Sequence, residues 1–269
     1  MKLNEWGITM KITSFYTNKA FIAVYTVLLS FNLLAQDSAL TIEEVIVTAE
    51  KRSESLQDIS QAITALSDSD IEDKNINSFV DLSAIVPGVT VAKNEGYKTV
   101  ISIRGVGNET NQNAIAAPSV AFHMDGIFVA SPFALQTDFI DVERIEVIRG
   151  PQGTLFGQNS TGGAINVISK KPSTDSYSAK GDLTLGNYGL TKYRVTNNVP
   201  VSDKVATRFS FSSTEREGFS NNVFTGQDLD DANNTSVRSD WLIDLDDASS
   251  LRIFGQYFEV DRNGAAIRG

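Results

Sequence analysis

The sequence predicts an α+β domain followed by a series of antiparallel β-strands, and two observations carry this prediction. Between residues 41 and 172, short apolar runs that suit strands are mixed with two helix-start patterns and with glycine-containing turns. After Pro172 the pattern changes to segments of about ten residues in which apolar and polar side chains alternate. The chain of 269 residues is 41% hydrophobic, so it carries enough apolar surface to fold.

Composition and charge exclude several classes of protein and site. The 23 Lys and Arg residues against 33 Asp and Glu residues give a formal charge of −10. A nucleic-acid-binding protein needs a basic surface for phosphate contacts, so no nucleic acid is expected as a partner. The absence of cysteine excludes disulfides, thiolate metal sites and a cysteine nucleophile. Since His123 is the one histidine, a histidine-rich metal site is also excluded.

Residues 1–35 have the pattern of a secretory signal peptide. Three lysines and one acid precede an uncharged run, 20–35, that ends in the small residue Ala35. The run is shorter than the ~20 residues that cross a bilayer as a helix, which favours export over a membrane anchor. We therefore expect an exported chain that begins at Gln36, with Met10 as an alternative start of translation. Any membrane crossing by the remaining chain would use β-strands.

The first half of the α+β domain contains both expected helices. They should begin at Ser69-Asp70-Ile71-Glu72 and at Ser78-Phe79-Val80-Asp81, because a serine three residues before an acid satisfies the free amides of a helix start. The second helix should end before the turn pair Pro87-Gly88. Strands are expected at 45–48, 62–66, 89–92 and 100–104.

The second half contains a hairpin and a glycine-rich segment. Asp125-Gly126 is a hairpin signal between two short apolar runs. Residues 150–163 hold five glycines, but the lysine of a phosphate-binding loop is absent, and Gly105-Val106-Gly107 lacks the third glycine of a dinucleotide fingerprint. A nucleotide-dependent enzyme is therefore a weak alternative, and tight turns with close backbone packing are expected instead. Strands are expected at 120–124, 127–129, 145–148 and 164–169.

Five amphipathic strands are expected after Pro172, although Leu242, Phe254 and Phe258 interrupt the alternation. Strands with one polar face are typical of an outer-membrane barrel with a wet lumen, while a soluble β-sandwich also alternates. The connection 216–233 is long and acidic, so it is predicted to be a mobile outer loop. The five strands are expected at 177–185, 191–199, 205–214, 235–245 and 249–260.

On these residues the chain resembles the TonB-dependent outer-membrane receptors. The resemblance is specific at DVERIEVIRGPQGTLFGQNSTGGAINVISKKP (141–172), which is similar to the end of that family's plug domain. Three further segments, at 82–89, 101–107 and 120–129, also resemble plug sequences. EEVIVTA (43–49) is similar to the family's energy-coupling segment. The resemblance thus implies a TonB box formed by Glu44, Val45, Ile46, Val47, Thr48 and Ala49.

The resemblance implies an α+β plug domain followed by antiparallel β-strands of an incomplete outer-membrane β-barrel. The implied plug domain covers 53–172, and an extended segment with the TonB box precedes it at 36–52. The first strands of the barrel, about five, would occupy 173–269. The family's barrel has about 22 strands, so we expect the chain to be a truncated receptor.

The function that the resemblance implies is energised uptake of a large, scarce nutrient through the outer membrane of a Gram-negative bacterium. An iron–siderophore complex is the first candidate ligand, and cobalamin or a carbohydrate are others. The implied protein partner is TonB with its inner-membrane energising complex, which would add a strand to the TonB box. No enzymatic activity and no cofactor are expected. The alternative is a soluble periplasmic binding module, similar to a plug, without transport activity.

The resemblance also assigns roles to plug residues. Arg104 and Arg149, each in an Ile-Arg-Gly motif, would lock the plug to barrel carboxylates, although ordinary surface ion pairs of little worth are the alternative. Substrate contacts are expected from polar segments such as 93–98 and 106–117, without individual residues being assigned. The glycines of the plug motifs are Gly105, Gly150, Gly153, Gly157, Gly162 and Gly163.

Overall fold

The structure is a computed structural model of the chain. It describes residues 46–47, 54–55, 61–94, 98–107, 118–246 and 248–264. The chain divides into two compact units, 1–43 and 44–269, and the first lies entirely outside the described residues. The expected signal peptide at 1–35 therefore lies outside them as well. Among the described residues, no helix is both long enough and apolar enough to cross a membrane.

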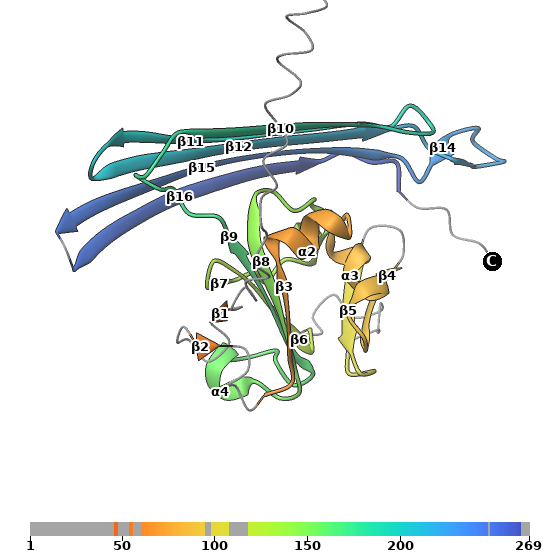
Figure 1. Ribbon diagram of the computed structural model, residues 1–269. Coiled ribbons are helices and arrows are strands. Elements are labelled where there is room, and N and C mark those ends of the chain that lie inside the picture. Colours follow the sequence, from red (N-terminus) through yellow and green to blue (C-terminus); the bar gives the residue numbers. More distant parts are fainter. Residues whose placement is uncertain are drawn as a thin grey trace, which may run out of the picture. The chain divides into compact units, whose positions relative to one another are not determined.

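The α+β part is built on a five-stranded sheet with the order β3-β8-β9-β6-β7 (Figure 1). Strands β6 and β9 pair in parallel, and the other neighbours pair antiparallel. The central strand β9 is buried at every residue, which matches its apolar sequence. The strands are β3 (Ile63–Ser67), β6 (Val120–Met124), β7 (Ile127–Phe128), β8 (Val142–Arg149) and β9 (Gly163–Ser169).

Short helices and a second hairpin complete this part. The ring of Phe79 makes edge contacts with Phe122 and Phe139, at centroid distances of 4.7 and 4.6 Å, in the centre of the apolar core. Burial of each such side chain stabilises the fold by roughly 1.5–3 kcal/mol. The elements are α2 (Asp68–Asp73), α3 (Phe79–Ile85), β4 (Val89–Asn94), β5 (Lys98–Ile103), the 3-10 helix η2 (Pro132–Gln136) and α4 (Gly153–Phe156).

The first helix begins two residues earlier than the sequence predicts. The N-cap is Ser67, whose hydroxyl accepts from the Asp70 amide at 3.2 Å, while the Asp70 carboxylate accepts from the Ser67 amide at 3.2 Å. The prediction chose Ser69, yet Ser67 and Asp70 have the same capping spacing. Because Ser67 is also the last residue of β3, the helix follows the strand without a linker.

The second helix and the hairpin turn agree with the sequence prediction. Helix α3 follows the cap Ser78, whose amide donates to the Asp81 carboxylate at 2.9 Å, and it ends before the Pro87-Gly88 turn. In the turn between β6 and β7, Asp125 and Gly126 both have positive φ, of 49° and 81°. Such a pair of angles defines the hairpin turn that Asp-Gly favours.

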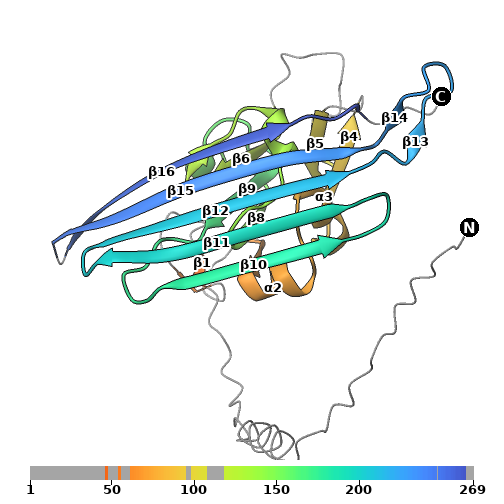
Figure 2. The ribbon, with the colours of Figure 1, turned by 90° about the horizontal axis from the view of Figure 1, so that it is seen from above.

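The five predicted amphipathic strands form one antiparallel sheet with the order β10-β11-β12-β15-β16 (Figure 2). We call it the large sheet. Its strands are β10 (Ser178–Leu185), β11 (Thr191–Ser202), β12 (Val205–Arg216), β15 (Ala232–Asp246) and β16 (Ser249–Val260). The connection 216–233 is more regular than expected, since β13 (Ser220–Asn221) and β14 (Asp228–Leu229) form a small hairpin within it.

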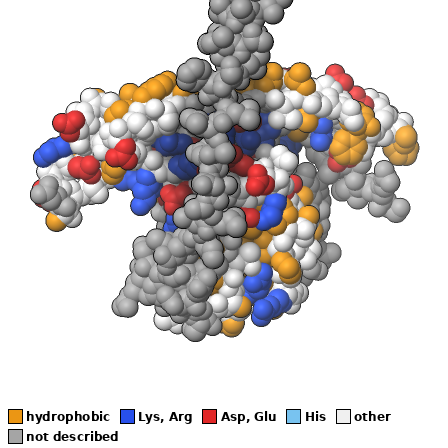
Figure 3. Space-filling view, in the orientation of Figure 1, with side chains coloured by type: hydrophobic (Ala, Val, Ile, Leu, Met, Phe, Trp, Pro, Cys, Tyr) orange, Lys and Arg blue, Asp and Glu red, His pale blue; other side chains and the backbone are white. Residues whose placement is uncertain are grey.

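Burial in the large sheet is inverted relative to a soluble protein. Polar side chains such as Ser210, Ser236 and Asp240 are buried, at 2% exposure or less. Apolar side chains such as Val195 and Ile253 are exposed, at 48% and 54%. Figure 3 shows hydrophobic side chains along the upper side of this sheet and charged ones along its lower side. A soluble sandwich buries its apolar face, so this sheet does not have the burial pattern of that alternative.

Candidate functional site

The centre of the predicted TonB box is a short strand. Ile46 and Val47 form β1 (Ile46–Val47), which pairs antiparallel with β2 (Glu54–Ser55). Val47 is fully buried. One edge of this segment is therefore already occupied by β2. The other residues of the predicted box, Glu44, Val45, Thr48 and Ala49, lie outside the described residues.

Both Ile-Arg-Gly motifs form turns at strand ends. In the first, Arg104 and Gly105 have φ of 53° and 78°, and the amides and carbonyls of Ile103 and Val106 bond reciprocally at 3.0 and 2.9 Å. The second motif ends β8, and its Gly150 has φ of 92° and donates its amide to the Gly162 carbonyl at 3.1 Å. Each arginine is thus placed beside a turn that needs a left-handed backbone.

The two motifs meet at Gly162 and Gly163. A Cβ atom on Gly162 would lie 2.8 Å from the Val106 carbonyl oxygen, beside the first motif. A Cβ on Gly163 would lie 2.3 Å from the Ile148 carbonyl oxygen, in the second motif. These distances are too short for any other residue type, so the glycines allow two backbone segments to touch. The structure thereby bears out the predicted close packing at these two positions.

Arg104 and Arg149 lie close enough to influence each other. The pKa of Arg149 is lowered, first by burial and second by the positive charge of Arg104. Arg149 donates from Nη2 to the Thr64 hydroxyl at 2.6 Å. Within the described part of the chain neither guanidinium pairs with a carboxylate, so their role as a plug lock stays a prediction.

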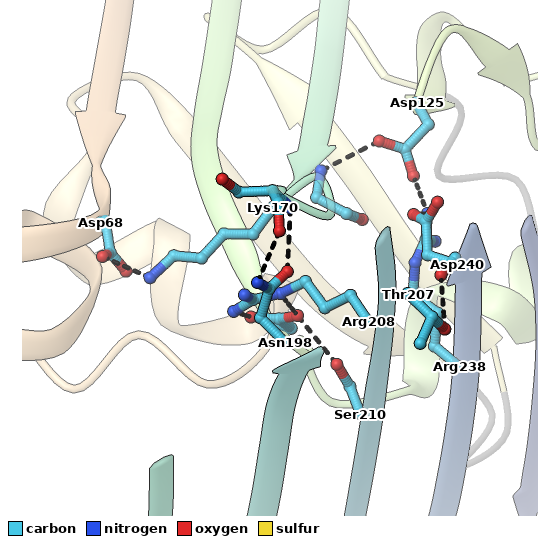
Figure 4. Close-up of polar contacts among 12 residues, drawn as sticks. Asp68, Asp125, Lys170, Asn198, Thr207, Arg208, Ser210, Arg238 and Asp240 are labelled. Carbon is cyan, nitrogen blue, oxygen red and sulfur yellow. Dashed lines mark hydrogen bonds and ion pairs between the residues drawn. The ribbon is translucent and has the colours of Figure 1, made fainter. Parts of the chain in front are cut away.

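A second set of charged residues joins the α+β part to the large sheet. Here the acids lie in the α+β part and the cations in the sheet. The Asp141 carboxylate, next to β8, accepts from Arg208 Nε at 2.5 Å and from Arg208 Nη2 at 2.6 Å. It also accepts from the Ser210 hydroxyl at 2.8 Å. Arg208 and Ser210 both lie on β12 and point toward this contact (Figure 4). A bidentate arginine–carboxylate pair is among the strongest polar contacts in proteins.

Three further acids of the α+β part make similar contacts with strands of the large sheet. Asp138 accepts from the Thr214 hydroxyl at 2.7 Å and lies 3.3 Å from Lys192 Nζ. Glu72, at the end of α2, pairs with Lys180, and this hydrogen bond is the main reason that the pKa of Glu72 is lowered. The fourth acid, Asp125, pairs with Arg238 at 2.7 Å.

Sequence reasoning missed this interface, although a signal was present. Every strand of the large sheet carries a cation on its polar face, and a buried cation on such a face needs an acid opposite it. The prediction instead relied on the Ile-Arg-Gly motifs, which suggested arginines in the plug and acids in the barrel. The cations are Lys180 on β10, Lys192 on β11, Arg208 on β12, Arg238 on β15 and Arg252 on β16.

The structure offers no defined ligand or metal site in its described part. The segments expected to touch substrate, 93–98 and 106–117, lie mostly outside the described residues. A cavity of about 360 Å³ lies between α2, β8 and the strands β10 and β11. The eight charged residues that line it form four ion pairs with one another, so no unpaired charge points to a ligand. The described residues contain no group of acids and histidine that could hold a metal ion.

Comparison with known sequences identifies the α+β part. Residues 55–164 match the family model described as "TonB-dependent Receptor Plug Domain". The iron-regulated outer membrane virulence protein of Vibrio cholerae is 30% identical over 203 residues, which cover 70% of this chain and 30% of the relative. The pesticin receptor of Yersinia pestis is 31% identical over 193 residues, which cover 65% of this chain and 27% of that protein. The chain thus spans about a third of the length of these relatives.

A vitamin B12 transporter, BtuB of Vibrio vulnificus, is 31% identical over 168 residues, covering 60% of this chain and 26% of the transporter. Among solved structures, the ferric yersiniabactin uptake receptor FyuA from Yersinia pestis matches with a TM-score of 0.69 and 22% identity. The match covers 79% of this chain and 33% of that receptor, and at this identity it establishes the fold.

Proposed function

Because the chain carries the plug domain of a TonB-dependent receptor followed by antiparallel strands, we propose that it serves energised uptake of a large, scarce nutrient. The uptake would cross the outer membrane of a Gram-negative bacterium, to which the chain is exported by residues 1–35. The names of relatives favour an iron–siderophore complex as ligand, with cobalamin second. A carbohydrate is the third candidate.

The observation that carries this proposal is the inverted burial of the large sheet. Its polar face holds the cations that pair with plug acids, while its apolar face presents exposed residues such as Val195 and Ile253. In water such a face would promote aggregation, whereas in a bilayer it contacts lipid. This argues against the alternative of a soluble periplasmic binding module, which has no need of an exposed apolar sheet face.

The plug lock is part of the same proposal. Arg104 and Arg149 carry like charges near each other, and the turns of their motifs hold both in place. Two neighbouring guanidinium groups are stabilised by a carboxylate that contacts both. We propose that barrel carboxylates supply that contact.

Energy would reach the plug through residues 44–49. TonB would add a strand to this segment, in the manner by which extended peptides bind to sheet edges. Backbone pairing tolerates changes of side chain but not the loss of an amide donor. Ile46→Pro therefore tests the proposal, since proline has no amide hydrogen and is excluded from a ladder at that position. Ile46→Val is the matched control, because it keeps both the donor and the branched side chain.

The experiment uses cells that express the receptor from its own gene. Surface binding and energised accumulation are measured with siderophores loaded with radioactive iron and with labelled cyanocobalamin. Ile46→Pro should abolish accumulation and leave surface binding nearly unchanged, while Ile46→Val should match the wild type. A parallel loss of binding and accumulation in Ile46→Pro would instead mark β1 as a core strand. The burial of Val47 is the reason to test for this outcome. Surface binding without accumulation in the wild type would count against energised uptake.

A further inference from the structure

The turn between β6 and β7 places a plug carboxylate among arginines of the large sheet. Asp125 accepts through Oδ2 from Arg238 Nη2 at 2.7 Å (Figure 4). Its Oδ1 lies 3.7 Å from Arg252 Nη1. Oδ1 also accepts from the Ser169 amide at 3.0 Å, at the end of β9. One side chain therefore joins the hairpin, the last plug strand and the sheet.

The same two arginines have a second carboxylate, which belongs to the sheet itself. Asp240 on β15 lies 3.1 Å from Arg238 Nη2 and accepts from Arg252 Nη2 at 2.5 Å. We call Asp125, Arg238, Asp240 and Arg252 the Asp125 network, and its two positive and two negative charges cancel. Three of these side chains are at most 2% exposed, and Arg252 is 18% exposed. A buried arginine that loses its counter-charge is strongly destabilising.

Arg238 has two further partners on the neighbouring strand β16. Its guanidinium carbon lies 4.4 Å from the ring centroid of Phe254, and its Nη1 donates to Gln256 Oε1 at 3.2 Å. Phe254 interrupted the alternation expected from the sequence, and this contact accounts for an aromatic residue on a polar face. A cation is attracted to the face of an aromatic ring, most strongly away from water.

The Asp125 network is asymmetric, because Asp125 comes from the plug and the other three members come from the sheet. When the plug shifts, Asp125 leaves and the two arginines keep Asp240. We propose that Asp240 is a standby counter-ion that makes the plug–sheet contact at Asp125 reversible. This inference rests on the proposed function, since energised uptake requires the plug to move relative to the barrel. Without Asp240, each departure of the plug would leave two buried cations uncompensated.

The proposal predicts opposite effects of Asp125→Asn and Asp240→Asn on the strength of the plug–sheet contact. Asp125→Asn removes the charge, while asparagine still tolerates a positive φ and still accepts from the Ser169 amide. The plug contact should weaken. Asp240→Asn leaves Asp125 as the sole negative charge in the network, so opening of the contact should become more costly. A residue that merely stabilises a static cluster would give the same sign for both variants.

Hydrogen–deuterium exchange of the purified receptor tests this prediction in peptides that cover 120–129 and 163–169. Asp125→Asn should speed exchange there about tenfold, which corresponds to about 1.4 kcal/mol. Asp240→Asn should slow it severalfold. Asp182→Asn is the matched control, because its partner Arg194 also belongs to the large sheet, and exchange in these peptides should not change. Faster exchange in both Asp125→Asn and Asp240→Asn would overturn the proposal.

If the Asp240→Asn receptor does not assemble, Phe254→Leu provides a second test of the proposal. It keeps every charge and weakens the support that the sheet alone gives Arg238, so it should slow exchange in the same peptides about threefold. Faster exchange in Phe254→Leu would equally overturn the proposal. These exchange measurements need no ligand. A wild-type receptor that accumulates none of the tested probes would therefore count against the proposed function without deciding the role of Asp240.

Discussion

At the scale of single residues, the glycines of segment 150–163 differ in what they do for the plug. Gly163 has φ of 146°, and a Cβ atom there would lie 2.3 Å from the Ile148 carbonyl oxygen and 2.9 Å from Ile103 Cδ1. Gly153 begins α4, and a Cβ atom there would have no neighbour within 4 Å. The first position therefore excludes a side chain, and the second accepts one.

Gly163→Ala should lower the free energy of unfolding of the plug by at least about 2 kcal/mol, because it adds both backbone strain and overpacking. Gly153→Ala should be neutral or stabilise the plug by up to about 1 kcal/mol, because alanine restricts the unfolded chain. Pulse proteolysis of the receptor across a urea series measures both variants against the wild type. Equal urea midpoints for the two would contradict this account.

Sequence reasoning predicted close packing for these glycines, yet it could not rank them by how well each position accepts a side chain. The ranking depends on carbonyl groups that the fold brings from Val106 and Ile148, and such long-range neighbours leave no local pattern. The charges that join Asp141 to Arg208 escaped prediction for the same reason, since the two residues are 67 positions apart. The predicted lock residues Arg104 and Arg149 are close together, and their carboxylate partners remain a proposal.

At the scale of elements, the start of α2 provides a test between two serines with similar sequence contexts. Ser67→Ala should destabilise the plug by about 1 kcal/mol, because the Ser67 hydroxyl accepts from the Asp70 amide. Ser69→Ala should cost less than about 0.5 kcal/mol, since that serine is not the cap. The same urea series with pulse proteolysis measures the difference. A larger loss for Ser69→Ala would restore the helix start that the sequence predicts.

Elements with a repeated pattern were predicted well, and four short elements without one were missed. All five strands of the large sheet were predicted, because alternation over about ten residues is a strong signal. The hairpin at Asp125-Gly126 was predicted because two residues with positive φ have a distinctive composition. The elements α4, η2, β13 and β14 span two to five residues each, so no period exists within them to detect.

At the scale of the whole molecule, two sheets follow opposite rules of burial. The plug sheet buries apolar residues such as Ile145 and Val167, as soluble domains do. The large sheet buries polar residues such as Ser210, Asp240 and Arg238, and exposes apolar residues such as Val195 and Ile253. The family model that matches residues 55–164 agrees with the plug domain expected from the sequence. The alternating sequence of the large sheet is compatible with either a barrel or a sandwich. The identity of its buried face distinguishes the two.

This inversion gives a prediction that separates a membrane receptor from a soluble binding module. Val195 and Thr196 are neighbours on β11 and lie on opposite faces of the large sheet. Val195 is on the apolar face, where Val195→Asp would place a carboxylate in lipid. The cost should be roughly 1–3 kcal/mol, because acids on the lipid face cost less than the ~2–4 kcal/mol of basic residues at the midplane. Thr196→Asp is the control, since Thr196 lines the cavity that also contains Arg194 and Arg208.

The measurement is the folded fraction of the receptor in outer-membrane preparations, read from its heat-modifiable mobility in gels. Val195→Asp should reduce that fraction severalfold, while Thr196→Asp should stay near the wild-type value, because its carboxylate would lie in a polar cavity lined by charged residues and not against lipid. A soluble module predicts the reverse. There the Val195 side chain would face water, and Val195→Asp would raise solubility without loss of folded protein. A folded fraction that is unchanged or higher in Val195→Asp would therefore argue that the apolar face of the large sheet does not contact lipid.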